Sequence, residues 1–164
     1  MVRYVPAILI VIFVLSLPLW AATIFQVQGR SMEPLLHHGD RVWVWLSAFD
    51  LRLPGTELRL VELRPPSAGD VVLLEHPDSR QLIIKRIIGT PLTPISLDDG
   101  SGRIGEYTFS WQNSSPLRLY SRVPPGYYMV LGDNQARSQD SRQFGFVPRD
   151  AIRGKVLGIR HNGR

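Results

Sequence analysis

The sequence predicts a mainly β protein, in which an antiparallel β-sheet domain follows a single N-terminal membrane-spanning helix. Beyond residue 26, the apolar stretches are short, rich in β-branched and aromatic residues, and separated by Gly, Pro and Asp. This composition is typical of strands joined by turns. Helical periodicity is nearly absent from that part of the chain. A long uncharged run near the N-terminus indicates the membrane helix.

The N-terminal run covers residues 5–25 and carries no charged side chain. As a helix it would be about 31 Å long, which matches the ~30 Å hydrocarbon core of a bilayer. Because it is longer than the apolar part of most signal peptides, we expect an uncleaved anchor over residues 1–26. Cleavage beside the small residue Ala22 is the alternative. Arg3 favours a cytoplasmic N-terminus, with residues 27–164 forming an extracytoplasmic domain.

The strand predictions are based on β-branched and aromatic enrichment between turn signals. They cover residues 41–46, 70–76, 81–89, 126–133 and 152–160. The turn residues in EHPDSR predict a hairpin over 70–89, and those in 95–112 predict another. The segment 51–69 is expected to be a loop or an edge strand, because Pro65 and Pro66 cannot donate to a central ladder.

The charge balance is basic, with a net charge of +5 and a pI near 10.1. The basic residues are scattered and no recognition-helix pattern accompanies them, so attraction to an anionic membrane surface is favoured over nucleic-acid binding. The chain has no cysteine, which excludes disulfides and thiolate metal sites.

A serine lies close to the predicted anchor, in the segment QGRSMEPLLHHGD of residues 28–40. Ser31 follows a glycine by two positions and is itself followed by Met32. A turn or a cap would explain this hydroxyl. A nucleophile would explain it as well, provided that the rest of the chain supplies a base.

Lysine is rare in this chain, which has only Lys85 and Lys155. Arginine does not lose its proton in a protein, whereas lysine can. In a strand over 81–89, Lys85 shares a face with Ile83 and Ile87. If that face is buried, desolvation lowers the pKa of the Lys85 amine and makes it a candidate base. The alternative is an edge-strand lysine that discourages aggregation.

A third segment, residues 123–148, gathers many short hydrogen-bonding side chains after a predicted strand. Gly132, Asp133 and Asn134 end that strand, and Ser138, Asp140, Ser141 and Arg142 follow within ten residues. Asp140 and Arg142 can form an ion pair that stiffens the loop. A polar surface loop is the alternative interpretation of this composition.

Taken in order, the three segments closely resemble the successive motifs of type I signal peptidases (leader peptidases). The segments are SMEPLLHHGD, GDVVLLEHP with LIIKRIIGTP, and VPPGYYMVLGDNQARSQDSRQFGFVP. The resemblance covers the anchor and most of residues 26–156. It implies a signal-peptidase-like antiparallel β-sheet fold and a membrane-bound serine protease with a Ser/Lys dyad.

The resemblance also implies a role for individual residues. Ser31 matches the nucleophile and Lys85 the general base. Positions that match supporting residues are Ser138, which orients the lysine, the pair Asp140 and Arg142, and the turn Gly132, Asp133 and Asn134. Met32, Ile83 and Ile84 match substrate-binding positions. The oxyanion would be bound by the backbone N–H of Ser31, with Gly29 contributing only backbone.

The implied substrates are membrane-inserted preproteins, cleaved after small residues at −3 and −1. The implied setting is a bacterial plasma membrane, with the lipid bilayer as a partner and no cofactor, metal or nucleic acid. Two features depart from the family pattern. Gly29 stands where some relatives carry a serine, and GTPLT replaces Gly-x-Pro-Gly-Asp after the lysine motif. The family's second domain is reduced here to little more than residues 91–122.

Other functions stay open on sequence alone. A processing protease with a narrow conjugation or pilus substrate would carry the same motifs. A membrane-anchored binding module without activity is the non-enzyme alternative. A histidine-based triad or metal site would need His37, His38, His76 or His161, and none of these has the spacing of a known ligand motif.

Overall fold

The computed structural model describes residues 22–52, 59–112 and 114–162. Its main element is a seven-stranded sheet in which all neighbouring strands are antiparallel, in the order β1-β2-β12-β5-β6-β10-β11. The strands are β1 (Ala22–Gln26), β2 (Arg41–Trp45), β5 (Val71–Glu75), β6 (Leu82–Gly89), β10 (Tyr127–Leu131), β11 (Val147–Pro148) and β12 (Ile152–Arg160).

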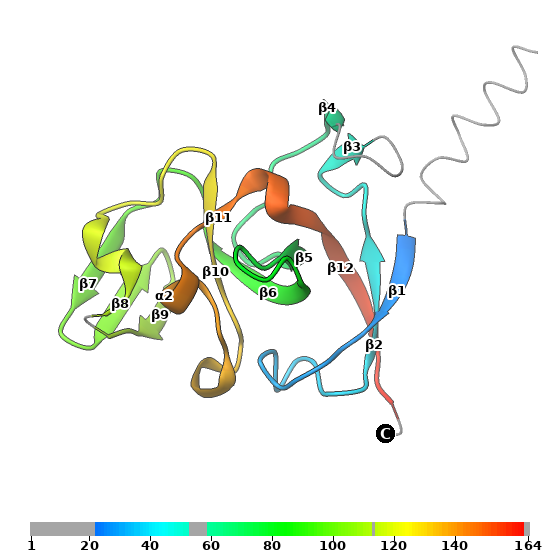
Figure 1. Cartoon of the computed structure of the whole chain (residues 1–164), viewed down its shortest axis with the longest axis horizontal. Coiled ribbons are helices and arrows are strands. Elements are labelled where there is room, and N and C mark those ends of the chain that lie inside the picture. Colours follow the sequence, from blue (N-terminus) through cyan, green and yellow to red (C-terminus); the bar gives the residue numbers. More distant parts are fainter. Residues whose placement is uncertain (1–21, 53–58, 113, 163–164) are drawn as a thin grey trace, which may run out of the picture.

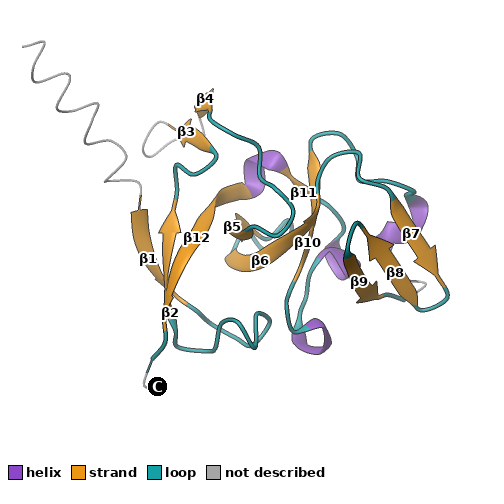
Figure 2. Ribbon diagram, turned by 180° about the vertical axis from the view of Figure 1, so that it is seen from behind, coloured by secondary structure: helices purple, strands orange, loops and turns teal. Residues whose placement is uncertain are grey.

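Two smaller sheets accompany the main one (Figure 1). The first pairs β3 (Asp50–Arg52) with β4 (Arg59–Glu62). The second joins β7 (Ile95–Asp98), β8 (Ser101–Ile104) and β9 (Tyr107–Ser110). Short helical turns complete the described chain: η1 (Pro116–Leu119), η2 (Gln135–Arg137), α2 (Ser141–Phe144) and η3 (Arg149–Ala151). The β7–β9 sheet lies at the opposite end of the molecule from β1 (Figure 2).

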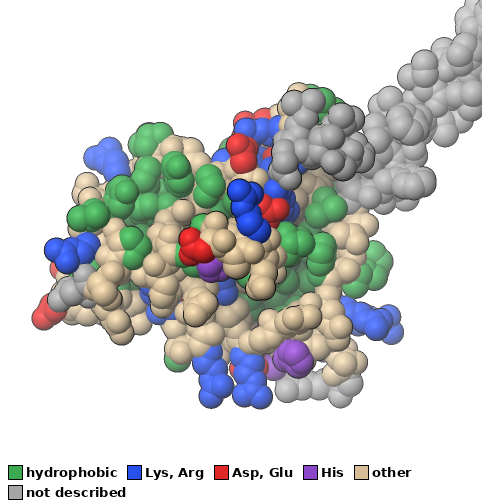
Figure 3. All heavy atoms as spheres, in the orientation of Figure 1, with side chains coloured by type: hydrophobic (Ala, Val, Ile, Leu, Met, Phe, Trp, Pro, Cys, Tyr) green, Lys and Arg blue, Asp and Glu red, His purple; other side chains and the backbone are tan. Residues whose placement is uncertain are grey.

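Three clusters of buried side chains hold these sheets together. One lies around β5, β6 and β10 and includes Phe49, Leu74, Ile87 and Val130. A second packs the β7–β9 sheet against the main sheet through residues such as Ile88, Ile104, Phe109 and Met129. The third, which includes Val27, Met32, Leu36 and Val42, lies beneath the loop between β1 and β2. On the face shown in Figure 3, hydrophobic side chains gather toward the β7–β9 side, while Lys and Arg side chains are scattered, both at the edge and near the middle of the face.

The mainly β class and the predicted strands agree with this structure. The hairpin predicted over 70–89 is formed by β5 and β6, with Val72 paired to Lys85. β10 pairs with β6 from Arg86 to Gly89, so the first half of β6 has no strand partner on that side among the described residues.

Two predictions need correction. Residues 95–112 form three strands, β7 to β9, where the turn signals predicted a two-stranded hairpin. The last residues assigned to the membrane span, 22–25, belong to β1, which pairs with β2. The remainder of the predicted span lies outside the described residues. Within the described ranges, no helix is long and apolar enough to cross a bilayer.

Candidate active site

Ser31 lies in the loop between β1 and β2, and the packing of that loop determines its position. The loop is closed at its base by two backbone hydrogen bonds, from Val27 N–H to the Asp40 carbonyl (2.8 Å) and from Gly39 N–H to the Val27 carbonyl (2.9 Å). Met32 is 2 % exposed and packs in the cluster beneath the loop. With its neighbour anchored in this way, Ser31 is half-buried at the surface of the sheet.

Lys85 lies in β6 and its amine points at Ser31. The side chain is 3 % exposed, and Nζ donates a hydrogen bond of 2.8 Å to Ser31 Oγ. Among the described residues, no carboxylate forms an ion pair with this amine. Burial lowers the pKa of Lys85 from 10.5 to about 8, while the nearby Asp140 carboxylate opposes the shift. Lys85 thus lies in a buried environment on the strand face that it was expected to share with Ile83 and Ile87.

The other lysine has a different environment. Lys155 lies in β12, and its Nζ is 2.5 Å from a carboxylate oxygen of Asp70. The Lys155 amine therefore has a carboxylate partner. Lys85 donates instead to the Ser31 hydroxyl, and burial lowers its pKa.

The turn Gly132–Asn134 follows β10 and contacts the Ser31 backbone. Asn134 N–H donates to the Ser31 carbonyl at 2.9 Å. A Cβ atom at Gly132 would overlap Ser138 Oγ and would lie 2.5 Å from the Ser31 carbonyl oxygen. Only glycine allows this close approach, so this turn sets the backbone position of Ser31.

Asp133 pairs with an arginine of the lysine-bearing strand. Its carboxylate accepts from Arg86 Nε at 2.8 Å and from Nη2 at 2.7 Å. This two-point contact fixes the turn to β6 immediately beside Lys85. Neither the strand pattern nor the motifs predicted this pairing of Arg86 with Asp133.

Asp140 and Arg142 form a buried ion pair that supports the same turn. Arg142 Nε donates to Asp140 Oδ1 at 2.8 Å, and Asp140 is fully buried. The second oxygen, Oδ2, accepts from Gly132 N–H at 3.1 Å. Asp140 also caps α2 through Arg142 N–H. The pair predicted from the sequence therefore connects α2 to the turn beside Ser31.

Ser138 lies within this framework, 6 % exposed, at the end of η2. Its Oγ is buried and has no hydrogen-bond partner among the described residues. The Lys85 amine donates to Ser31 Oγ in this structure, and no hydrogen bond joins it to Ser138. A buried hydroxyl without a partner is unusual in proteins.

The two groups expected to bind an oxyanion differ in their availability. Ser31 N–H donates to no acceptor within the described ranges. Gly29 N–H donates to Nδ1 of His38 at 3.2 Å and is therefore occupied. Gly29 has a φ of +87°, a conformation that side chains other than glycine rarely adopt. The backbone conformation therefore argues against a serine at this position, where some relatives carry one. The hydrogen bond between Gly29 and His38 was not predicted, because it depends on how the loop between β1 and β2 turns back on itself.

A groove of about 440 Å³ runs from Ser31 and Lys85 along the unpaired half of β6. Its lining residues come from the end of β1, the Ser31 loop and the β5–β6 hairpin, and they include Phe25, Val27, Met32, Leu73, Ile83 and Ile84. The structure thus brings Ser31, Lys85 and the three expected substrate-binding positions to one groove. A hydroxyl activated by a neutral amine beside such a groove is suited to attack on an extended peptide.

Comparison with known proteins gives consistent matches. The family described as "Signal peptidase, peptidase S26" matches residues 1–109 and 96–159. The chain is 27% identical over 157 residues to a probable signal peptidase I-2 of Synechocystis sp., covering 90% of this chain and 66% of the relative. It is 36% identical over 138 residues to the mitochondrial inner membrane protease subunit 1 of Schizosaccharomyces pombe, covering 82% and 72%.

The chain spans just under two thirds of the length of several of these relatives. Among solved structures, a signal peptidase I from Enterococcus faecalis is 29% identical to this chain. That match has a TM-score of 0.48 and covers 59% of this chain and all of the solved chain.

Proposed function

Because the chain belongs to the signal peptidase family, peptidase S26, we propose that it is a serine endopeptidase that removes signal peptides from translocated preproteins. The observation that carries this proposal is the 2.8 Å contact between Lys85 Nζ and Ser31 Oγ. The amine is buried, has no carboxylate partner in the described chain, and has a pKa lowered to about 8.

In the proposed reaction, Ser31 is the nucleophile and Lys85 is the general base. The neutral amine takes the Ser31 hydroxyl proton while Oγ bonds to the scissile carbonyl carbon. The negative charge that develops on the carbonyl oxygen is stabilised by Ser31 N–H. As the C–N bond breaks, protonated Lys85 gives its proton to the leaving amine. Water then attacks the acyl-enzyme by the same steps and releases the signal peptide.

Ser138 is proposed to position the Lys85 ammonium. Once the amine has accepted a proton, it carries three donors, and Ser31 Oγ is no longer available because it is bonded to the substrate. The buried Ser138 Oγ has no partner among the described residues and can accept one of these donors. Asp140 and Arg142 are proposed to hold the turn on which this arrangement depends.

The proposed substrate lies extended in the groove. The first half of β6 has no strand partner on the β10 side, so the backbone of Ile83 and Ile84 can pair with a substrate strand. Apolar side chains that line the groove then receive alternate substrate residues. Small residues at −3 and −1 are expected there.

We further propose that the membrane anchor lies within residues 1–26, before β1, and that the extracytoplasmic peptidase domain begins with β1 and continues through residues 27–164. The bilayer would then be a partner of the protein, with a bacterial plasma membrane as its location. The uncharged run and Arg3 support this proposal. β1 begins at Ala22, so the catalytic domain would start directly after the anchor and Ser31 would lie near the membrane surface.

The test is cleavage of a purified preprotein by the full chain in detergent. We expect cleavage by the wild type and none by Ser31→Ala, with unchanged circular dichroism. Replacing alanine at −1 of the preprotein by phenylalanine should abolish cleavage. Cleavage by Ser31→Ala at the wild-type rate would refute the assignment of Ser31 as the nucleophile. Equal cleavage of the alanine and phenylalanine preproteins would refute the proposed specificity.

A further inference from the structure

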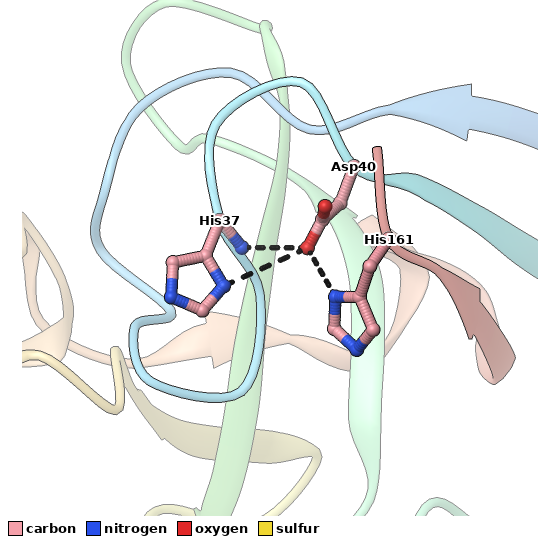
Figure 4. Close-up of side chains that lie close together, drawn as sticks. All are labelled: His37, Asp40 and His161. Atoms are coloured by element: carbon pink, nitrogen blue, oxygen red, sulfur yellow. Dashed lines mark hydrogen bonds and ion pairs between the residues drawn. The ribbon is translucent and has the colours of Figure 1, made fainter. Parts of the chain in front are cut away.

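Three side chains with metal-ligating atoms meet outside the groove, at the base of the Ser31 loop (Figure 4). His161 Nδ1 is 2.9 Å from Asp40 Oδ2, and His37 Nδ1 is 3.8 Å from the same oxygen. The three ligand atoms lie within 4.8 Å of one another. Both imidazole rings turn their Nδ1 atoms toward the carboxylate.

We propose that His37, Asp40 and His161 form a binding site for a divalent transition-metal ion of the zinc type. Two imidazoles and one carboxylate are a ligand set that zinc uses, with a fourth position left to water. Ligands about 2.0–2.1 Å from a tetrahedral ion lie about 3.4 Å apart. The two separations between a histidine Nδ1 and the Asp40 carboxylate, 2.9 and 3.8 Å, bracket that value, and all three ligand atoms lie within 4.8 Å of one another. Calcium and magnesium are disfavoured because they require more oxygen ligands.

The carboxylate of the site is held in place by the backbone. Asp40 is 3 % exposed; its Oδ2 accepts from His37 N–H at 2.9 Å and its Oδ1 from Asn162 N–H at 3.0 Å. Such contacts orient a metal ligand before the ion arrives. Among the described residues, the only side chains that pair with this carboxylate are those of His37 and His161. In the described part of the chain, no arginine or lysine competes with an ion for it.

The sheet brings distant parts of the chain to this site. β12 pairs with β2 up to Arg160 opposite Arg41, so His161 leaves the sheet directly beside Asp40. The His161 side chain is 47 % exposed and that of His37 is 32 % exposed, which leaves an open side for the ion and its water ligand. The sequence led us to expect no metal site, because no histidine has the spacing of a known ligand motif and because Asp40 and His161 are 121 positions apart.

Bound metal would fasten the end of β12 to the base of the loop that carries Ser31. Val27 and Gly39 close that loop through backbone hydrogen bonds at the same place. An ion that binds the folded chain alone stabilises it by mass action, so the melting temperature should depend on zinc concentration. This inference does not depend on the role of Ser31 or Lys85.

The first test is a zinc titration of the full chain in detergent, without a polyhistidine tag and after treatment with a chelator. We expect one Zn²⁺ per chain by calorimetry and a rise in melting temperature. Because loss of an outer-shell partner alone costs about 10–100-fold in affinity, His37→Ala and His161→Ala should each weaken binding by at least about tenfold. His76→Ala is the matched control, since the His76 side chain accepts hydrogen bonds from the backbone of the β5–β6 turn and packs on the Phe144 ring, away from the three proposed ligands.

A second measurement uses Co²⁺, whose visible absorption reports tetrahedral coordination by nitrogen and oxygen. We expect this absorption in the wild type and in His76→Ala, and not in the two other variants. Circular dichroism would verify that each variant is folded. The proposal is wrong if the wild type binds no zinc up to millimolar concentration, or if folded His37→Ala and His161→Ala bind zinc as tightly as the wild type.

Discussion

Lys85 is a buried amine whose hydrogen-bond partner is a hydroxyl. Replacing it with arginine keeps the charge but removes the ability to act as a base, because a guanidinium is not deprotonated in a protein. We expect Lys85→Arg to lower kcat/KM on a preprotein by several orders of magnitude while the variant remains folded. Lys155→Arg is the control, and it should keep its pairing with Asp70 and nearly full activity. An active Lys85→Arg protein would exclude the proposed base.

The pH profile tests the same residue without a mutation. Since the neutral amine is the proposed base and its pKa is about 8, kcat/KM should rise with pH and level off above that value. The folded chain also binds fewer protons than the unfolded chain between pH 8 and 10.5. The contribution of Lys85 to the free energy of unfolding should therefore increase with pH across this window. A profile that levels off near pH 6.5 would point to a histidine.

Gly29 illustrates how backbone conformation, and not available space, can determine the effect of a substitution. There is open space around it, with no heavy atom within 4 Å of a Cβ added there, but its φ is +87°. We expect Gly29→Ser to cost about 1 kcal/mol of stability or more and to reduce activity by displacing the Ser31 loop. Gly29→Ala is the matched comparison, because it adds the same strain without a hydroxyl. Higher activity in Gly29→Ser than in the wild type would show that an oxyanion donor is gained there.

At the scale of elements, the end of β10 must approach the Ser31 loop closely. A methyl group at Gly132 would overlap Ser138 Oγ and press on the Ser31 carbonyl. We expect Gly132→Ala to move Ser31 away from Lys85, lowering kcat far more than it raises KM. Gly158→Ala in β12 should leave activity nearly unchanged, since the nearest atom to an added Cβ would be in the Trp43 side chain, 4.0 Å away. Equal activity of the two variants would show that the turn does not position the nucleophile.

The strands that could be predicted from sequence are those in which apolar and β-branched residues dominate, such as β2, β5 and β6. β8 was missed because Ser101–Ile104 is short and glycine-containing, so its residues resemble a turn. β1 was assigned to the membrane span because a continuous apolar run does not distinguish a helix from a strand. Its pairing with β2 depends on residues that lie far along the chain.

At the scale of the whole molecule, the alternation in β6 left two environments open for Lys85, a buried face or an exposed edge strand, and the family motifs predicted its proximity to Ser31. The distances themselves depend on the curl of the seven-stranded sheet and on the packing of the loop against it. The cluster of His37, Asp40 and His161 could not be predicted, because it depends on the register of β12 against β2. Local sequence patterns contain no information about a register between segments more than a hundred residues apart.

The orientation of the whole chain in the membrane is the last prediction. Arg3 and the amino terminus precede the uncharged run, and the next charged residue is Arg30. Positive charge is retained on the cytoplasmic side, so the catalytic domain should face outward. In intact spheroplasts, added protease should remove a C-terminal tag and leave an N-terminal tag protected. A cytoplasmic marker must stay intact in the same sample. Protection of the C-terminal tag until lysis would show the opposite orientation. The groove would then lie on the cytoplasmic side, away from translocated preproteins.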